Sequence, residues 1–212
     1  GIRFFLGLNS IFFSMEIEVI IKNQYSKIFT ESDWRPFKSM ADFYFKNAAF
    51  LLKKDVDIQD SLKLMARNIQ KRLFLGIGTE LLLKSFYLKN GYCINRALRG
   101  KKISINKPIL LNSIKSLDVL NPMETFTLNS LIQNLKPLIQ TGNWKEIEKG
   151  LKIAKVFRNK EGHVAVYWHK ADPENYSSIE KSIIEIYKVG FNQVLNFQVS
   201  FENDEKAEFY LE

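Results

Sequence analysis

The sequence predicts a mainly α-helical protein, with short β-strands near its N- and C-terminal ends. Glycine and proline, which interrupt regular elements, number only 10 and 5 among 212 residues. Hydrophobic residues make up 46% of the chain, and over long segments they recur at the spacing of one helix face. A chain of this length can bury a continuous core, so we expect a single domain over residues 1–212.

Two elements are predicted in the first quarter of the chain. Residues 15–21 read MEIEVII, and their apolar and charged side chains largely alternate, as in a short strand. A first helix is predicted to begin near Pro36, because proline fits the first turn of a helix and Asp33 can cap it. We expect this helix to run toward Leu52.

The strongest helical pattern runs from Ile58 to Asn90, and Gly91 closes it as a C-terminal cap. Its apolar stripe at helical spacing consists of Leu62, Ile69, Leu73, Ile77, Leu81 and Leu88. Gly76 and Gly78 fall inside this helix, where each costs about 1 kcal/mol relative to alanine. Such glycines either permit a close helix crossing or mark a bend.

The second half of the chain predicts further helices and an ambiguous tail. Helices are expected at Pro108–Asp118, at Glu124–Gln140, from Trp144 to about Arg158 and from about Asn175 onward. Residues 195–211 alternate well enough for a strand pair around Asn203, while a helical continuation to Phe201 fits nearly as well. The sequence leaves these two alternatives open.

The charge balance is strongly basic. Lysine and arginine number 31 against 23 acidic residues, a formal net charge of +8. Such an excess attracts polyanions such as RNA at long range, but it also serves simply to keep a protein surface soluble. The charge therefore favours a polyanionic partner without identifying one.

Several classes of protein are disfavoured by what the sequence lacks. Cys93 is the only cysteine, which excludes an internal disulfide framework and a multi-cysteine metal site and indicates a reducing, cytoplasmic compartment. Asn9 and Ser10 interrupt the apolar run at 1–14, which disfavours an export signal. We expect this segment to pack on the core or to dock a partner. No segment reaches the ~20 apolar residues of a membrane span. There is no glycine-rich phosphate loop, serine elbow or metal-ligand cluster. We therefore expect no membrane association, no metal and no cofactor.

The two histidines, His163 and His169, lie in one short segment that follows the helix predicted to end near Arg158. A histidine can take and give a proton near neutral pH, and an arginine presents a planar, charged fork that matches phosphate oxygens. Together they can act on a phosphodiester. The imidazole would deprotonate an attacking hydroxyl, and the guanidinium would stabilise the charge that builds on phosphorus.

On spacing alone, the simpler interpretation of this segment is structural: Arg158 would cap a helix C-terminus and His163 would fill a turn. The position of Arg158 favours a function instead. It continues the predicted buried stripe of Ile147, Leu151 and Ala154, where an unpaired cation is costly unless a partner or a site requires it. We therefore treat Arg158 and His163 as the candidate active pair.

The segment Arg158–His163, RNKEGH, resembles the signature of the HEPN superfamily (higher eukaryotes and prokaryotes nucleotide-binding domain). That signature is an arginine, usually followed by a polar residue, with a histidine a few positions later. Asn159 supplies the polar neighbour. The segment Gly76–Asn95 is similar to the earlier core helix of that family, in which an acidic residue, here Glu80, precedes a leucine-rich run.

The resemblance implies both a fold and an activity. The fold is an antiparallel helical bundle whose core covers about 58–195, with 1–55 and 196–212 as elaborations, and which dimerises so that two Arg/His pairs share a cleft. The activity is that of a metal-independent endoribonuclease that uses the ribose 2′-hydroxyl as nucleophile and leaves a cyclic phosphate. Many members of the family are toxins of toxin–antitoxin pairs or antiviral effectors. The implied partners are therefore RNA, a second copy of the chain and an antitoxin or regulatory protein.

The resemblance also implies roles for single residues. Arg158 would stabilise the transition state, His163 would be the acid/base group, and Asn159 would orient one of them. The candidate RNA contacts beside this site are Lys160, Tyr167 and His169. They would act through charge and through stacking on bases. Some members of the family only bind, so the alternative function is a non-catalytic protein that binds a nucleotide or a partner on the same scaffold.

Glu80 has two interpretations. Functionally, it resembles the acidic residue of the family's earlier core helix and could reach Arg158 or orient His163. Structurally, it lies four residues before Lys84, close enough on a helix for the two side chains to neutralise each other. The sequence favours neither interpretation over the other.

Overall fold

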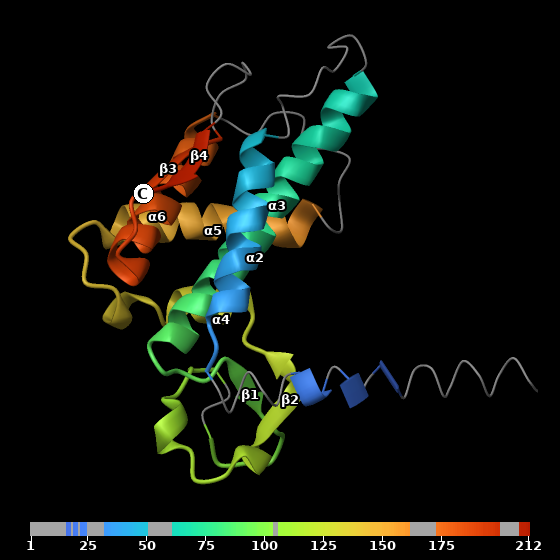
Figure 1. The fold of residues 1–212 in the computed structure, drawn as a ribbon, viewed down its shortest axis with the longest axis vertical. Helices are drawn as coiled ribbons and strands as arrows, with labels where there is room; N and C mark the ends of the chain where they lie inside the picture. Colours follow the sequence, from blue (N-terminus) through green and yellow to red (C-terminus); the bar gives the residue numbers. More distant parts are fainter. Residues whose placement is uncertain are drawn as a thin grey trace, which may run out of the picture. The chain divides into compact units, whose positions relative to one another are not determined.

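The computed structural model describes residues 16–17, 19–20, 22–24, 32–50, 61–103, 106–161, 173–199 and 208–212. Over these residues the protein is mainly helical with a few short antiparallel strands (Figure 1), which confirms the predicted fold class. The chain forms two compact units, a smaller one of residues 1–34 and 87–126 and a larger one of residues 35–86 and 127–212. The assignment of a core at 58–195 with elaborations on either side stays a prediction.

The larger unit is built from helices and one strand pair. Its helices are α2 (Arg35–Phe50), most of α3 (Ser61–Lys89), α4 (Leu128–Gln133), α5 (Trp144–Glu161) and α6 (Pro173–Phe191), and a 3₁₀ turn lies at Lys136–Leu138 (Figure 1). Strands β3 (Leu195–Gln198) and β4 (Glu208–Leu211) are antiparallel, with Leu195 opposite Leu211. Of the two alternatives for the tail, the strand pair is therefore the one found.

The predicted helix boundaries agree with the structure where a proline or glycine marks them. α2 begins one residue before Pro36. α3 ends as expected at Gly91, which has a φ of +78° that glycine adopts without strain. Its N–H donates to the carbonyl of Leu88 at 2.9 Å, and the N–H of Tyr92 donates to the carbonyl of Tyr87 at 2.9 Å, so this turn satisfies the last carbonyls of the helix.

Close contacts fix the packing of α5 on α6 in the larger unit. A Cβ added to Gly150 of α5 would stand only 2.1 Å from the carbonyl oxygen of Ser178 in α6. One turn away, the Ser182 hydroxyl donates to the carbonyl of Ile147 at 2.9 Å. The two helices therefore run antiparallel with their backbones in near contact. Fully buried side chains of the larger unit include Phe45, Leu75, Leu82, Leu131, Leu151, Ile183 and Tyr187.

The strand predicted at 15–21 is wrong for the residues that the structure describes. Residues 16–17, 19–20 and 22–24 are helical. An alternation of seven residues is too short to separate a strand from a helix. The glutamates within it favour a helix and are depleted in strands.

The helix predicted at Pro108–Asp118 is also wrong. The segment makes two 3₁₀ turns instead, Leu111–Ser113 and Leu117–Val119. The second turn is capped by the Ser116 hydroxyl, which accepts the N–H of Asp118 at 3.2 Å. Serine and asparagine between the apolar residues offer the backbone such local hydrogen bonds in place of a helix.

The helix predicted at Glu124–Gln140 is shorter than expected. Its first residues belong to strand β2 (Leu120–Thr125), and α4 begins only at Leu128. Thr127 provides the reason, because its hydroxyl accepts the N–H of Ser130 at 3.3 Å and caps the helix there.

The smaller unit contains a strand pair that the sequence did not predict. Strand β1 (Asn95–Ala97) pairs antiparallel with β2, with Asn95 opposite Thr125 and Ala97 opposite Leu120. The side-chain amide of Asn95 donates to the carbonyl of Asn121 at 2.9 Å. A strand of three residues is too short to show an alternating pattern.

Candidate functional site

The buried stripe of α5 does not end in Arg158. Ile147, Leu151 and Ala154 are buried as predicted, but the next buried residue is Phe157, and the Arg158 side chain is 42% exposed. The prediction that Arg158 continues the buried stripe is therefore wrong. The third and the fourth residue after Ala154 both lie at helical spacing, and the apolar one takes the buried position.

The backbone of α3 lies directly against α5 at Arg158. A Cβ added to Gly76 would stand 2.5 Å from Cβ, 2.7 Å from N and 2.8 Å from Cα of Arg158. Real Cβ atoms do not approach backbone atoms so closely, so only glycine fits at this crossing. Gly78 has the same role toward α2, because its added Cβ would lie 2.8 Å from the Phe45 ring. Of the two roles that the sequence allowed for these glycines, the close helix crossing is the one found.

One turn beyond Gly76, Glu80 holds the guanidinium of Arg158. One carboxylate oxygen of Glu80 accepts a hydrogen bond from Nε of Arg158, and the other accepts one from Nζ of Lys84 at 2.8 Å. The side chains of Glu80 and Lys84 are only 13% and 11% exposed. Glu80 therefore makes both contacts that the sequence suggested, the local one with Lys84 and the distant one with Arg158. A shielded carboxylate shared by two cations holds them more firmly than a surface pair would.

The guanidinium of Arg158 keeps a free edge. Glu80 uses its Nε, and none of the residues that the structure describes hydrogen-bonds the two terminal nitrogens. Those nitrogens form the fork that binds phosphate or carboxylate oxygens in pairs. Asn159 and Lys160, next along α5, are exposed as well. The end of α5 can therefore offer two cations and an amide to an anion.

The remaining candidate residues lie outside the described part of the chain. His163, Tyr167 and His169 fall in 162–172, directly after the end of α5. The pairing of Arg158 with His163 therefore stays a prediction. The same holds for Tyr167 and His169 as RNA contacts. The described residues establish the arginine half of the candidate site and the carboxylate behind it.

Two buried cations of α3 were missed by the sequence reasoning. Lys71 and Arg72 are 4% and 1% exposed. The ammonium of Lys71 lies 4.7 Å from the centre of the Tyr176 ring. Burial lowers the pKa of Lys71 to about 8, while attraction to Glu180 opposes this change and repulsion from Arg72 adds to it. A sequence signal for one of them exists: Arg72 begins a row of residues spaced by four along one face of α3, followed by Gly76, Glu80 and Lys84.

A second carboxylate of the larger unit is held in a similar way. Asp42 of α2 accepts hydrogen bonds from Lys38, at 2.7 Å, and from the hydroxyl of Tyr187 in α6. The ammonium of Lys38 lies 4.0 Å from the centre of the Tyr187 ring. Burial lowers the pKa of Lys38. Burial raises the pKa of Tyr187, and the negative charge of Asp42 raises it further. Tyr187 is fully buried, so this cluster presents no donor to a ligand.

Other chemistry has little support among the described residues. Cys93 is buried, and burial raises the pKa of its thiol, which fits a role in the core rather than that of a nucleophile. Within the described ranges, no three His, Cys, Asp or Glu side chains gather closely enough to hold a metal ion; neither histidine belongs to those ranges. None of the helices searched over the same ranges has both the length and the apolar content that a membrane crossing requires.

No protein-family model, curated protein or solved structure matches the chain. The resemblance to the HEPN superfamily therefore rests on Arg158, Asn159 and His163, on Glu80, and on the helical pattern around them. What the structure defines is a mainly helical protein in which a largely shielded carboxylate holds an exposed arginine near the end of α5.

Proposed function

We propose that this protein is a metal-independent endoribonuclease that cleaves RNA with Arg158 and His163. The observation that supports this most is the ion pair of Arg158 with Glu80, which fixes one edge of the guanidinium, while no described residue hydrogen-bonds its terminal nitrogens. His163 follows the last helical residue of α5 by two positions. An anchored cation beside an acid/base group is what phosphodiester chemistry requires.

The proposed reaction is an internal transfer at phosphorus. His163 takes the proton of the ribose 2′-hydroxyl, and the resulting oxygen attacks the adjacent phosphorus. The bond from phosphorus to the 5′-oxygen breaks, that oxygen receives a proton from the imidazolium, and a 2′,3′-cyclic phosphate remains. Arg158 binds the non-bridging oxygens, whose negative charge grows in the transition state, and Asn159 orients one of the two groups.

Glu80 acts in this scheme as a positioning residue. Its bond to Nε restricts the rotation of the guanidinium, so less order has to be imposed when RNA binds. Lys84 binds the same carboxylate. Glu80 therefore neutralises only part of the positive charge of Arg158. The terminal nitrogens therefore keep their attraction for phosphate.

The proposal includes a symmetric dimer, because the resemblance implies two Arg/His pairs in one cleft. It also includes a cytoplasmic location and a role as a toxin or antiviral effector, controlled by an antitoxin or regulatory protein. Light scattering on the purified protein should return twice the mass of the chain. A monomer at micromolar concentration would contradict the dimer.

One observation favours the alternative of a non-catalytic binding protein. Glu80 and Arg158 join α3 to α5 over 78 positions of sequence, which is also what an arginine with a purely structural role would do. In that case the same scaffold would bind a nucleotide or a partner protein without cleaving RNA.

A cleavage assay in chelator separates the two functions. Total RNA is incubated in EDTA with the wild type, with His163→Ala and with His169→Ala as the matched histidine control. We expect fragments that end in cyclic phosphate and a loss of about 10²–10⁴-fold in His163→Ala. His169→Ala should lose much less activity, because it removes a candidate base contact and no acid/base group. Cleavage that chelator abolishes and magnesium restores would contradict the mechanism. RNA that is bound but left intact by the wild type would favour the binding protein.

A further inference from the structure

One segment of the smaller unit, residues 87–126, carries most of the chain's excess positive charge. Residues 87–126 are 40 of the 212 residues, yet they contain seven basic and two acidic ones, a net charge of +5 out of +8. The basic residues are Lys89, Arg96, Arg99, Lys101, Lys102, Lys107 and Lys115. The acidic residues are Asp118 and Glu124. Charge concentrated in this way produces a local positive potential that charge spread over the whole chain would not.

Most of these cations are exposed and not neutralised. All of them except Arg96 are classed as exposed. Arg96 approaches Glu124 at 4.0 Å, and the two side chains are 37% and 59% exposed, so their pairing is weak. Within the part of the chain that the structure describes, no carboxylate pairs with Arg99, Lys101, Lys102, Lys107 or Lys115.

A hydrogen-bonded scaffold carries the densest group of cations. Arg99, Lys101 and Lys102 follow β1 on a turn at Gly100, whose φ is +79°. The N–H of Leu98 donates to the carbonyl of Val119 at 2.8 Å, and the N–H of Lys101 donates to the carbonyl of Leu98 at 3.2 Å. The three cations therefore project from a fixed turn rather than from a free linker, which reduces the order that a ligand has to impose.

We propose that residues 87–126 form a surface that binds the phosphodiester backbone of a nucleic acid, and that the turn with Arg99, Lys101 and Lys102 is its centre. The choice of RNA as the natural ligand rests on the proposed function. Of the three aromatic side chains in residues 87–126, Tyr87 and Phe126 are buried and Tyr92 is half-buried with its ring edge-on to Tyr87, so this segment offers few rings for stacking on bases. Contacts to phosphates alone carry no sequence information, and binding should therefore be insensitive to sequence.

A membrane surface fits the same residues less well. Proteins that lie on membranes insert aromatic and leucine side chains from one face of an amphipathic helix. The exposed large apolar residues in the described part of residues 87–126 are Leu110, Leu117 and Met123. They lie on three separate segments: before the first 3₁₀ turn, in the second turn and in β2. Isolated aliphatic side chains of this kind are ordinary on a protein surface.

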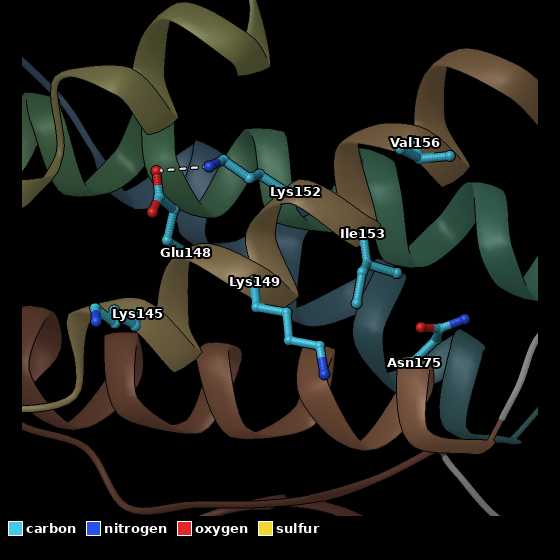
Figure 2. A pocket seen from close by; sticks show the side chains of 7 residues that line it. All are labelled: Lys145, Glu148, Lys149, Lys152, Ile153, Val156 and Asn175. Atoms are coloured by element: carbon cyan, nitrogen blue, oxygen red, sulfur yellow. Dashed lines mark ion pairs between the residues drawn. The ribbon is translucent and has the colours of Figure 1, made fainter.

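The face of α5 offers a second group of lysines, and it serves as the control. A depression of about 440 Å³ is lined by Lys145, Lys149 and Lys152 of α5 and by Asn175 of α6, whose side chains are drawn in Figure 2. Lys152 pairs with Glu148 at 2.9 Å, and Lys149 pairs with Glu174 at 2.8 Å. Two of its three cations are thus already neutralised, and we expect it to contribute little to binding of a polyanion.

Salt-dependent binding tests the proposal. Fluorescence anisotropy of a short labelled single-stranded RNA is measured between about 50 and 200 mM salt, where each lost phosphate contact lowers the slope of log affinity against log salt by about 0.7. The experiment compares the wild type with the triple variant Arg99→Ala/Lys101→Ala/Lys102→Ala. The control is Lys145→Ala/Lys149→Ala/Lys152→Ala, which removes the same amount of charge from α5. All proteins carry His163→Ala so that RNA stays intact, and thermal melting verifies that each is folded.

We expect the slope to fall by about 2 in the first triple variant and to stay near the wild-type value in the control. DNA of the same sequence and vesicles with anionic lipids are the other two ligands tested. Equal losses in both triple variants, or an unchanged slope in the first, would overturn the proposal. The proposal would also be overturned if the turn proved necessary for binding to vesicles and unnecessary for binding to nucleic acid. Cleavage is measured separately in proteins with His163 intact, so a protein that binds RNA through this turn without cleaving it would sink only the proposed function.

Discussion

Two carboxylates of the larger unit, Asp42 and Glu80, are held by the same arrangement with different partners. Each accepts a hydrogen bond from a lysine four residues away on its own helix, Lys38 for Asp42 and Lys84 for Glu80. Each also accepts one from a second helix, from the buried Tyr187 of α6 or from the exposed Arg158 of α5. Both carboxylates thus have a local lysine and a distant donor. The distant donor of Asp42, Tyr187, is neutral and buried, while that of Glu80, Arg158, is charged and exposed.

The difference shows how a stabilising contact can be distinguished from a candidate site. Tyr187 can only join helices, because its hydroxyl and its ring are buried. Arg158 joins helices with one nitrogen, and among the described residues nothing hydrogen-bonds its two other nitrogens. Replacing the distant donor should therefore affect stability in the Asp42 cluster and activity in the Glu80 cluster.

Among the changes that test this comparison of the two clusters, the largest expected effect is the loss of activity in Arg158→Ala. We expect RNA cleavage to fall by about 10²–10³-fold, as for the loss of an oxyanion donor. The free energy of unfolding should change by only about 0–1 kcal/mol, because the pair is partly exposed and Glu80 keeps Lys84. Cleavage rates and urea unfolding of the same preparation measure both quantities. A variant that cleaves at the wild-type rate while remaining folded would remove Arg158 from the site.

Tyr187→Phe should give the opposite result. Removing the hydroxyl deletes a buried hydrogen bond to a charged acceptor, and we expect a loss of about 1.5–3 kcal/mol in the free energy of unfolding. The cleavage rate at a temperature where the variant is folded should not change. An unchanged unfolding curve, or a rate loss comparable to that of Arg158→Ala, would erase the distinction between the two clusters.

Gly76→Ala tests the crossing that brings Glu80 and Arg158 together. In an open helix, glycine to alanine stabilises by about 1 kcal/mol. Here the added Cβ would meet backbone atoms of Arg158 at 2.7 and 2.8 Å, and we expect destabilisation of about 1–3 kcal/mol. Gly142→Ala is the control, since its added Cβ has nothing within 4 Å. Thermal melting decides the sign, and a Gly76→Ala variant that melts above the wild type would show that the crossing is not tight.

The last expected effect concerns the pH dependence of stability at Lys71 and builds up gradually over the titration window. Its pKa in the folded protein is about 8, below the ordinary value of 10.5, so between these values the unfolded chain binds more protons than the folded one. The free energy of unfolding should therefore rise as the pH increases through this window, by at most about 1.4 kcal/mol per pH unit. Lys71→Met should flatten the rise between pH 8 and 10, measured by urea unfolding. Above about pH 10 the raised pKa of Tyr187 acts in the opposite direction. An identical pH slope in wild type and variant would contradict a buried, destabilised ammonium.

The sequence predicted those features that depend on local rules. Pro36 and Gly91 mark helix ends through their own backbone preferences, and the spacing of Glu80 and Lys84 predicts their pairing. The contact of Glu80 with Arg158 spans 78 positions, and no local spacing could select it from other distant partners. The exposure of Arg158 was missed for a related reason, because periodicity alone could not show that Phe157 would take the buried position.

The shared carboxylate has a consequence for how Arg158 could move. An arginine that is the only counterion of a shielded carboxylate cannot leave it without stranding a negative charge away from water. Glu80 has a second counterion, since Lys84 is bonded to its other carboxylate oxygen at 2.8 Å. Glu80 therefore stays neutralised when the charge of a bound phosphate draws on Arg158, so the arginine can adjust to its ligand without unbalancing the carboxylate behind it.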